Sequence, residues 1–252
     1  MSLRSTSEAY NGPVIVIVGP TGSGKTGVAI EIAKEIGGEI ISADSRAIYK
    51  GMDIGTAKPT AEEQSEVPHF GIDLVEPGER FTVADWKAYA EQKIEEIRAR
   101  GHVPMVVGGT GLYVDALIYN YQFTDDAKKN YTDRDKMQPG YTVFGIKWTN
   151  EELRERLKLR LNKMFAQPLY DETERLANKY GWDSQAMKSN IYQFVWAYLQ
   201  GEMSLDEAKA ASFYDDYHLA KRQMTWFKRN PEITWLPLAK IKPAVLKCIQ
   251  DE

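Results

Sequence analysis

An eight-residue stretch near the start of the chain constrains its fold more than any other feature. It spans residues 19–26, reads Gly-Pro-Thr-Gly-Ser-Gly-Lys-Thr, and follows five consecutive apolar residues at 14–18. The residues after it, 27–34, repeat apolar side chains at helical spacing. A glycine-rich turn of the form G-x-x-x-x-G-K-S/T between a strand and a helix is the pattern of a phosphate-binding loop. The sequence therefore predicts a site for a di- or triphosphate at this loop.

The residue types of this loop suit phosphate. Glycines let backbone N–H groups converge on phosphate oxygens, and the N-terminus of the following helix adds a partial positive charge. Lys25 supplies a mobile full charge, and the hydroxyl of Thr26 is placed to ligate a phosphate-bound Mg²⁺, the cofactor we expect. The predicted phosphate-binding residues are Gly19, Pro20, Thr21, Gly22, Ser23, Gly24, Lys25 and Thr26.

Length, composition and charge exclude several classes of protein. The 252 residues are 43% hydrophobic and 27% charged, which is typical of a globular chain with one large or two modest domains. A net charge of −4 does not indicate a nucleic-acid-binding protein, so any such surface must be a local patch. The longest apolar run, at 14–18, is too short to cross a membrane, and the single Cys248 fits a reducing compartment. We therefore expect a soluble, cytoplasmic monomer without a membrane partner.

Apolar runs alternate with helical patterns through the first half of the chain. Further strands are expected at 39–44, 67–75 and 103–107, and helices at 82–100 and 112–119. This alternation predicts an α/β fold, with a parallel sheet flanked by helices as in P-loop NTPases.

The second half of the chain is predicted to be mostly helical. A strand is expected at 141–148 and a candidate strand at 233–236, and helices are expected at 149–165, 170–180, 185–199, 205–212 and 215–229. Capping boxes at Thr82, Thr149 and Ser204 mark three helix starts. We divide the chain into an α/β core at 1–121, a polar linker at 122–140, and a strand with a helical part at 141–252.

Asp44 is the first candidate for a catalytic residue. It ends the strand expected at 39–44, and ligands of a parallel sheet collect beyond the carboxyl ends of its strands. A carboxylate beside a bound phosphate can act as a general base or hold Mg²⁺. Taken alone, this arrangement suggests a small-molecule kinase in which Asp44 activates an acceptor hydroxyl. A helix cap or a plain loop residue is the structural alternative.

Thr110 lies in a second glycine cluster, at the end of the strand expected at 103–107. Its hydroxyl either binds a substrate or caps the next helix, and the residues alone do not separate these roles. Arg46, Lys50 and Lys58 lie in the polar segment 45–59, which suits substrate contacts, although scattered charges of this kind usually form a solvated surface. We interpret His69 as a packed strand residue.

Five motifs in order carry a resemblance to a known family. Besides the loop at 19–26, they are Ile-Ser-Ala-Asp-Ser-Arg-Ala-Ile-Tyr-Lys-Gly-Met-Asp-Ile-Gly-Thr-Ala-Lys-Pro at 41–59, Val-Pro-His-Phe-Gly-Ile-Asp-Leu-Val-Glu-Pro at 67–77, Val-Val-Gly-Gly-Thr-Gly-Leu-Tyr at 106–113 and Ala-Lys-Arg-Gln-Met-Thr-Trp-Phe-Lys-Arg at 220–229. Together they resemble the tRNA dimethylallyltransferases, also called tRNA isopentenyltransferases.

The resemblance implies a chemistry other than phosphoryl transfer. The loop would hold the diphosphate of dimethylallyl diphosphate, and Lys25, Mg²⁺ and the loop N–H groups would stabilise it as it leaves. Asp44 would be the general base for the exocyclic amine of the adenosine 3′ of the anticodon. Catalytic residues would be Lys25, Asp44 and Thr110. Residues that bind the anticodon arm of tRNA would be Asp44, Ser45, Arg46, Ala47 and Thr110, and metal ligands would be Thr26 and Asp44.

The chain departs from the family pattern at three places. The tRNA-contacting segment of the family normally ends in Gln, where this chain has Ala47. Family members usually carry a longer helical insertion with an Arg-rich segment, where this chain has only the polar stretch 122–140. A Thr-Arg pair, whose Arg assists catalysis in the family, is replaced by Asp216 and Tyr217, so that Lys221 and Arg222 are candidates to replace this Arg. We expect a shortened member of the family.

Two alternatives remain beside the leading hypothesis of dimethylallyl transfer to tRNA. The short length favours transfer to a free adenine nucleotide, as in the adenylate isopentenyltransferases, whereas the motifs at 51–59 and 220–227 favour tRNA. The missing insertion and Tyr217 favour a weakened module that binds tRNA or a nucleotide.

Overall fold

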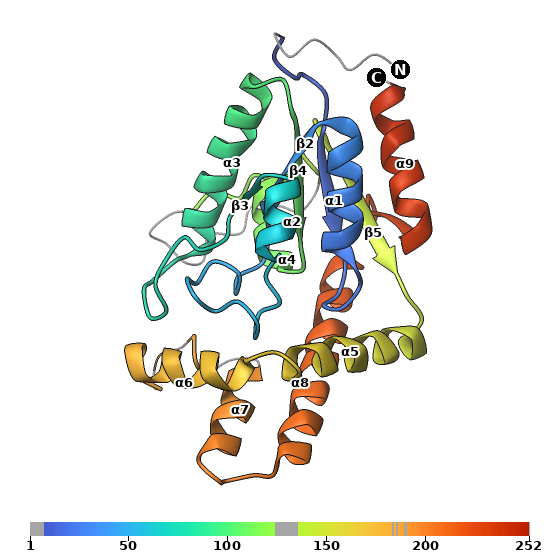
Figure 1. The fold of residues 1–252 in the computed structure, drawn as a ribbon. Helices are drawn as coiled ribbons and strands as arrows, with labels where there is room; N and C mark the ends of the chain where they lie inside the picture. The colour runs from blue at the N-terminus through green and yellow to red at the C-terminus, as the bar shows by residue number, and fades with distance from the viewer. Residues whose placement is uncertain (1–7, 124–135, 183, 185, 189–190, 252) are drawn as a thin grey trace.

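The computed structural model describes residues 8–123, 136–182, 184, 186–188 and 191–251. Figure 1 shows an α/β part that contains both the first strand and the last helix of the described chain and, at the opposite end, a group of helices. No helix in the described ranges is long and apolar enough to cross a membrane.

A parallel sheet forms the centre of the α/β part. Within the described residues it has six strands in the order β3-β2-β4-β1-β5-β6, and every pairing is parallel. The strands are β1 Val14–Val18, β2 Gly38–Ser42, β3 His69–Phe70, β4 Val103–Gly108, β5 Tyr141–Lys147 and β6 Thr234–Pro237. Every residue of β1, β2 and β4 is buried, as expected for parallel strands that are covered on both faces. The α/β fold class is confirmed.

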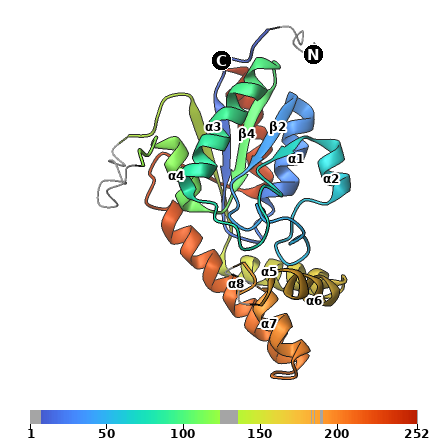
Figure 2. The ribbon, with the colours of Figure 1, turned by 90° about the vertical axis from the view of Figure 1, so that its left-hand side faces the viewer.

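Helices cover both faces of this sheet. On one face α1 (Lys25–Ile36) packs against α9 (Leu238–Gln250), with the short α2 (Ala61–Glu66) beside α1. On the other face lie α3 (Val83–Ala99) and α4 (Gly111–Ile118) (Figures 1 and 2).

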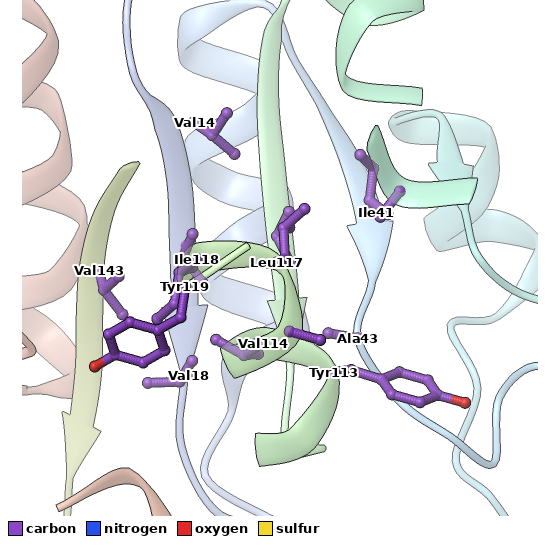
Figure 3. Packing of buried hydrophobic residues seen from close by; sticks show 14 of the residues in the cluster. Val14, Val18, Ile41, Ala43, Tyr113, Val114, Leu117, Ile118, Tyr119 and Val143 are labelled. Carbon is purple, nitrogen blue, oxygen red and sulfur yellow. The ribbon is translucent and has the colours of Figure 1, made fainter. Parts of the chain in front are cut away.

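The core beneath α4 joins this helix to the strands. Figure 3 shows part of it, in which Val114 and Leu117 of α4 share one buried cluster with Val18 and Val143. This packing fixes the turn between β4 and α4 relative to the loop that follows β1.

Within the described chain, four helices form the helical part beyond the carboxyl ends of the strands. They are α5 Asn150–Phe165, α6 Leu169–Tyr180, α7 Ile191–Leu199 and α8 Leu205–Phe227. Met52 of the α/β part is buried among their side chains, including Leu176 and Tyr192. α8 reaches from the helical part up to the sheet, where it lies against α4 (Figure 2).

The three predicted capping boxes are confirmed. Thr82, Thr149 and Ser204 each accept a hydrogen bond from the backbone N–H three residues later, and the acidic residue there accepts one in return. The candidate strand at 233–236 is confirmed as β6.

Two predicted boundaries in the second half are wrong. The helices expected at 205–212 and 215–229 form one helix, because neither Phe213 nor Tyr214 between them breaks a helix and the Phe213 ring stacks on Tyr217 one turn later. The helix expected at 185–199 starts too early, because residues 186–188 form a turn and the described helix begins at Ile191. Residues 185, 189 and 190 lie outside the described ranges.

The strand expected at 67–75 is much shorter in the structure. Pro68 has no N–H to give to a ladder, and the backbone of Gly71 and Asp73 is left-handed, with φ of 78° and 54°. Only His69 and Phe70 therefore pair with β2.

Two helices escaped the sequence analysis. α2 follows a capping box of Thr60 and Glu63, a signal that the sequence contains. Five of its six residues are polar and none is buried, so the sequence shows no apolar face. α9 contains Pro243, and a proline within a stretch argues against a helix there. In the folded protein Ile241 and Val245 of this helix are buried against the sheet, which stabilises it. The division at residues 121 and 140 stays a prediction, and β5, β6 and α9 of its third segment belong to the same sheet layers as its first.

Candidate active site

A cleft of about 1120 Å³ lies between the carboxyl edge of the sheet and the helical part. One wall comes from the phosphate loop, the segment after β2 and the turn after β4, and the other wall comes from α5 and α8. The predicted catalytic, phosphate-binding, tRNA-binding and metal-binding residues all line this cleft except Gly19 and Pro20, which begin the loop. The structure thus brings together the three regions that the sequence predicted as one site, at the edge where parallel sheets bind ligands.

The loop needs its glycines for their backbone conformation. Gly22 and Gly24 have φ of 74° and 88°, in the left-handed region that other residues adopt only with strain. Gly24 is the N-cap of α1, whose first helical residue is Lys25, so the loop leads directly into this helix. The loop and the helix N-terminus therefore have the geometry that phosphate binding requires.

Lys25 is folded into the loop. Its Nζ donates hydrogen bonds to the carbonyl oxygens of Gly19 and Pro20 at 2.9 and 2.8 Å. Burial lowers the pKa of Lys25 to about 8, the negative charge of Asp44 opposes this shift, and the positive charge of Arg160 adds to it. Asp44 and Arg160 therefore lie within electrostatic reach of the ammonium group.

Side chains distant in sequence hold the loop from outside. The indole of Trp148 donates to the carbonyl oxygen of Ser23 at 3.0 Å, and Nε of Arg156 donates to that of Gly22 at 2.8 Å. The amide oxygen of Gln223 accepts a hydrogen bond from the N–H of Thr21 at 2.7 Å. Sequence reasoning missed these three residues, although Gln223 lies in the quoted motif at 220–229.

Asp44 and Thr110 fix the segments that follow β2 and β4. One carboxylate oxygen of Asp44 accepts the N–H of Arg46 at 2.8 Å, so Asp44 orders a turn and caps no helix. The Thr110 hydroxyl accepts the N–H of Ser45 at 3.0 Å. Thr110 occupies the N-cap position of α4 but makes no side-chain capping bond, so its hydroxyl faces the other segment instead.

A close approach of two backbone segments explains why residue 108, two positions before Thr110, is a glycine. A Cβ at Gly108 would lie 2.2 Å from the carbonyl oxygen of Ala43, and the N–H of Thr110 donates to this same oxygen at 3.0 Å. The ends of β2 and β4 therefore touch directly beneath the site.

A buried lysine side chain anchors the segment 45–59. The Lys58 side chain is 3% exposed and pairs with Asp53 and Asp73 at 2.8 and 2.6 Å, so the interpretation as a solvated charge is wrong for this residue. The interpretation as a solvated charge is correct for Lys50, whose side chain is half-exposed and whose ammonium lies 3.4 Å from the carboxylate of Glu76.

A carboxylate of the helical part hydrogen-bonds to the backbone of the same segment, 45–59. Glu172 of α6 accepts hydrogen bonds from the N–H groups of Asp53, Ile54 and Gly55 and from the Tyr192 hydroxyl, at 2.6 to 3.2 Å. No sequence motif pointed to Glu172.

His69 is a strand residue, as interpreted, and it also borders the cleft. Its Nδ1 lies 2.8 Å from the carbonyl oxygen of Val67, and burial lowers the pKa of the imidazole. A neutral ring in a strand agrees with the structural interpretation.

A local basic wall lies on the helical side of the cleft. It consists of Arg156, Arg160 and Lys163 of α5 and Arg222 of α8. Tyr217 packs between Phe213 and the cations of Arg154 and Lys221 instead of lining the cleft. Of the two candidates for a replacement arginine, Arg222 therefore lines the cleft and Lys221 faces Tyr217.

The oxygen ligands present suit a metal that arrives with its phosphate. Thr26 and Asp44 both line the cleft. The described residues contain no group of three or more His, Cys, Asp or Glu side chains that could hold a metal by themselves. Mg²⁺ typically keeps several waters and binds through one or two protein oxygens plus substrate phosphates, so this donor set fits it.

Two family models match long stretches of the chain. A model described as IPP transferase matches residues 47–141 and 126–230, and one described as isopentenyl transferase matches residues 12–70. A tRNA dimethylallyltransferase of Bacillus pumilus is 37% identical over an alignment of 285 positions, gaps included, which covers 90% of this chain and 90% of the relative. The chain belongs to the IPP transferase family. By class it is a prenyltransferase.

Solved structures of similar proteins have the same fold. A tRNA delta(2)-isopentenylpyrophosphate transferase from Staphylococcus epidermidis superposes with a TM-score of 0.84 at 31% identity, over 96% of this chain and 100% of that one. A tRNA isopentenylpyrophosphate transferase from Bacillus halodurans gives a TM-score of 0.83 at 30% identity, over 96% and 98% of the two chains.

The IPP transferase match also agrees with a shortened family member. Its two parts overlap at residues 126–141, within and beside the polar stretch where the longer insertion was expected. The alignment with the Bacillus pumilus relative has 285 positions, more than the 252 residues of this chain, so the relative contains residues without a counterpart here. Residues 124–135 lie outside the described part of the structure.

Proposed function

We propose that this IPP transferase moves a dimethylallyl group from dimethylallyl diphosphate to the exocyclic amine of the adenosine 3′ of the anticodon in tRNA. One observation carries the proposal: a single cleft contains the phosphate loop, Asp44 and Thr110, in a chain whose relatives are named tRNA dimethylallyltransferases. The partners are therefore dimethylallyl diphosphate and the anticodon arm, in a cytoplasmic protein.

The loop is the proposed donor site. Lys25 now bonds to the carbonyl oxygens of Gly19 and Pro20, and diphosphate oxygens would replace these two acceptors. Thr26 and Asp44 would hold Mg²⁺, which neutralises charge on the diphosphate when it is bound. The N–H groups of the loop and Lys25 stabilise the negative charge that grows on the leaving diphosphate.

Asp44 is the proposed general base. The amine nitrogen of the adenosine attacks the first carbon of the dimethylallyl group, and the bond from that carbon to the diphosphate oxygen breaks with its electron pair. The proton of the amine passes to the carboxylate of Asp44, which the N–H of Arg46 holds in place. Atoms and charge therefore balance without a further reactant.

The acceptor side of the cleft is proposed to bind RNA. Thr110 and residues 44–47 would contact the base that enters the cleft. The exposed cations Lys163 and Arg222 would face phosphates of the anticodon arm and supply the local patch that a net charge of −4 requires.

One assay with two acceptors tests the proposal. The protein is incubated with dimethylallyl diphosphate, Mg²⁺ and either an anticodon stem–loop RNA or AMP, and mass spectrometry detects the added five-carbon group. An RNA with guanosine in place of the target adenosine is the matched control. We expect product only on the adenosine-bearing RNA.

Other outcomes would select the competing functions. Prenylated AMP beside unmodified RNA would assign a free-nucleotide acceptor, which the match of residues 12–70 to the isopentenyl transferase model also allows. RNA binding without product on either acceptor would indicate a binding module. Transfer of phosphate from ATP to an acceptor would indicate a kinase.

A further inference from the structure

We propose that Arg160 is a further ligand of the donor diphosphate and that Asp216 is the residue that positions it. This inference deepens the proposed function and rests on it for the identity of the donor. It concerns two side chains on different helices that meet at the phosphate loop.

α5 runs along the phosphate loop. Arg156 of α5 donates to the carbonyl oxygen of Gly22, and a Cβ on Gly22 would lie 2.8 Å from the side chain of Leu157. Arg160 is one turn after Arg156, so the two side chains share one face of α5. Arg160 lines the same cleft as loop residues 21–27, and its positive charge acts on Lys25.

Asp216 of α8 holds Arg160 in this position. Nη1 of Arg160 donates a hydrogen bond to Oδ2 of Asp216, in an ion pair whose side chains are 21% and 11% exposed. Because both groups are shielded from water, removing either one would leave the other partly buried without its counter-charge, which is costly. The carboxylate also offsets the repulsion between the guanidinium and the nearby ammonium of Lys25.

The remaining donors of Arg160 are available to an anion. A guanidinium has five N–H donors in a planar fork that matches phosphate oxygens. In the described part of the chain its one side-chain hydrogen bond is to Asp216. Arg156 differs, because it is committed to the loop carbonyl and to the Trp148 ring 4.6 Å away.

The other cleft cations are less suited to this role. Lys163 and Arg222 are exposed, where water screens their charge, whereas Arg160 is partly buried. A partly buried arginine beside the loop therefore gives the donor diphosphate a second cation besides Lys25.

Binding of inorganic pyrophosphate with Mg²⁺ to the full chain tests the proposal by calorimetry. We expect Arg160→Gln to weaken binding roughly 10- to 100-fold, as for the loss of a charge-assisted hydrogen bond to phosphate. Arg160→Lys should recover part of the loss, because it keeps the charge but loses the fork. Lys158→Gln, which removes a charge from another face of α5, is the matched control and should leave binding unchanged.

A double-mutant cycle separates positioning from a structural role. Asp216→Asn should weaken pyrophosphate binding in the wild-type background and add nothing in the Arg160→Gln background. Equal weakening in both backgrounds, or wild-type affinity of Arg160→Gln, would overturn the proposal. Thermal melts show whether each variant is folded. If Arg160→Gln does not fold, pyrophosphate affinity of Arg160→Lys tests the role of Arg160 instead, and an affinity equal to wild type would then overturn the proposal.

Activity gives a second, separable readout. In the wild-type background of the prenylation assay, Arg160→Lys should raise KM for dimethylallyl diphosphate and leave KM for the RNA unchanged. Absence of prenylation by the wild-type protein would refute the proposed function while the pyrophosphate result stands. Normal pyrophosphate binding by Arg160→Gln, beside prenylation by the wild-type protein, would refute this inference alone.

Discussion

Lys25 combines a full positive charge with a buried position in the loop. Its ammonium satisfies two loop carbonyl oxygens, while burial lowers its pKa to about 8. Near pH 8 the charged and neutral forms of Lys25 are therefore both populated, and a bound diphosphate would favour the protonated form. Diphosphate binding and protonation of Lys25 should thus be coupled.

We expect the affinity for pyrophosphate to fall as the pH rises through about 8, the pKa of Lys25 in the free protein. Binding at this pH should take up protons, which calorimetry in buffers of different ionisation enthalpy measures. Lys25→Arg stays charged and should flatten the profile. A wild-type affinity that stays constant from neutral to alkaline pH would contradict this coupling.

Asp44 is the proposed general base of the chemical step. Asp44→Ala should lower the turnover of prenyl transfer on the order of 10²–10⁴-fold, as for the loss of a general base, while binding of pyrophosphate in the absence of Mg²⁺ persists. Single-turnover assays and calorimetry measure the two effects. Asp215→Asn, which removes another carboxylate of the cleft, serves as the control. Retained turnover of Asp44→Ala would exclude the role as base.

At the scale of elements, α6 connects the helical part to the acceptor side of the cleft. The carboxylate of Glu172 accepts hydrogen bonds from three consecutive N–H groups and one hydroxyl, and these bonds order the segment that includes Asp53 and Gly55. Because these donors are partly or fully buried, they have no water to replace a lost acceptor. This single carboxylate therefore fixes the segment that carries the predicted RNA contacts.

Glu172→Gln should destabilise the protein and weaken the acceptor site. The amide would put a donor among N–H donors, which costs about 1–3 kcal/mol in free energy of unfolding, measured by denaturant titration. KM for the RNA should rise, while pyrophosphate affinity should not change. Tyr192→Phe removes one donor only and should cost less. Equal loss of RNA and pyrophosphate binding would point to general damage instead.

At the scale of the whole molecule, charge is distributed unevenly. The chain carries a net charge of −4, yet the helical wall of the cleft presents Arg156, Arg160, Lys163 and Arg222. These four cations outnumber Asp215 and Asp216, the carboxylates of α8 that line the same cleft, so the wall would attract a partner with many phosphates although the chain as a whole is negative. RNA affinity should therefore depend strongly on salt.

Lys163→Gln should weaken RNA binding and lower the slope of log affinity against log salt by about 1, the loss of one phosphate contact. Fluorescence anisotropy with a labelled stem–loop RNA measures this slope. Lys158→Gln on the same helix lies outside the cleft lining and should keep the wild-type slope. An unchanged slope for Lys163→Gln would place the RNA elsewhere.

Much of the fold could be predicted because its signals are local. Apolar runs, capping boxes and strand–helix alternation predicted the sheet and most helices. Helix and strand ends were less accurate, since the merging of two helices into α8 and the helix around Pro243 depend on packing. α8 packs against both α5 and α4, contacts that no single stretch of sequence displays.

The sequence by itself determined the phosphate loop, because glycine conformations and the charge of Lys25 belong to adjacent residues. Asp44 and Thr110 were predictable for a similar reason, since each follows a strand whose end could be located. Only the tertiary structure decided what surrounds them. The contacts of Gln223 with Thr21 and of Arg160 with Asp216 join residues 202 and 56 positions apart. Such contacts arise from the packing of α5 and α8 against the loop, which is a property of the folded chain and not of any local pattern.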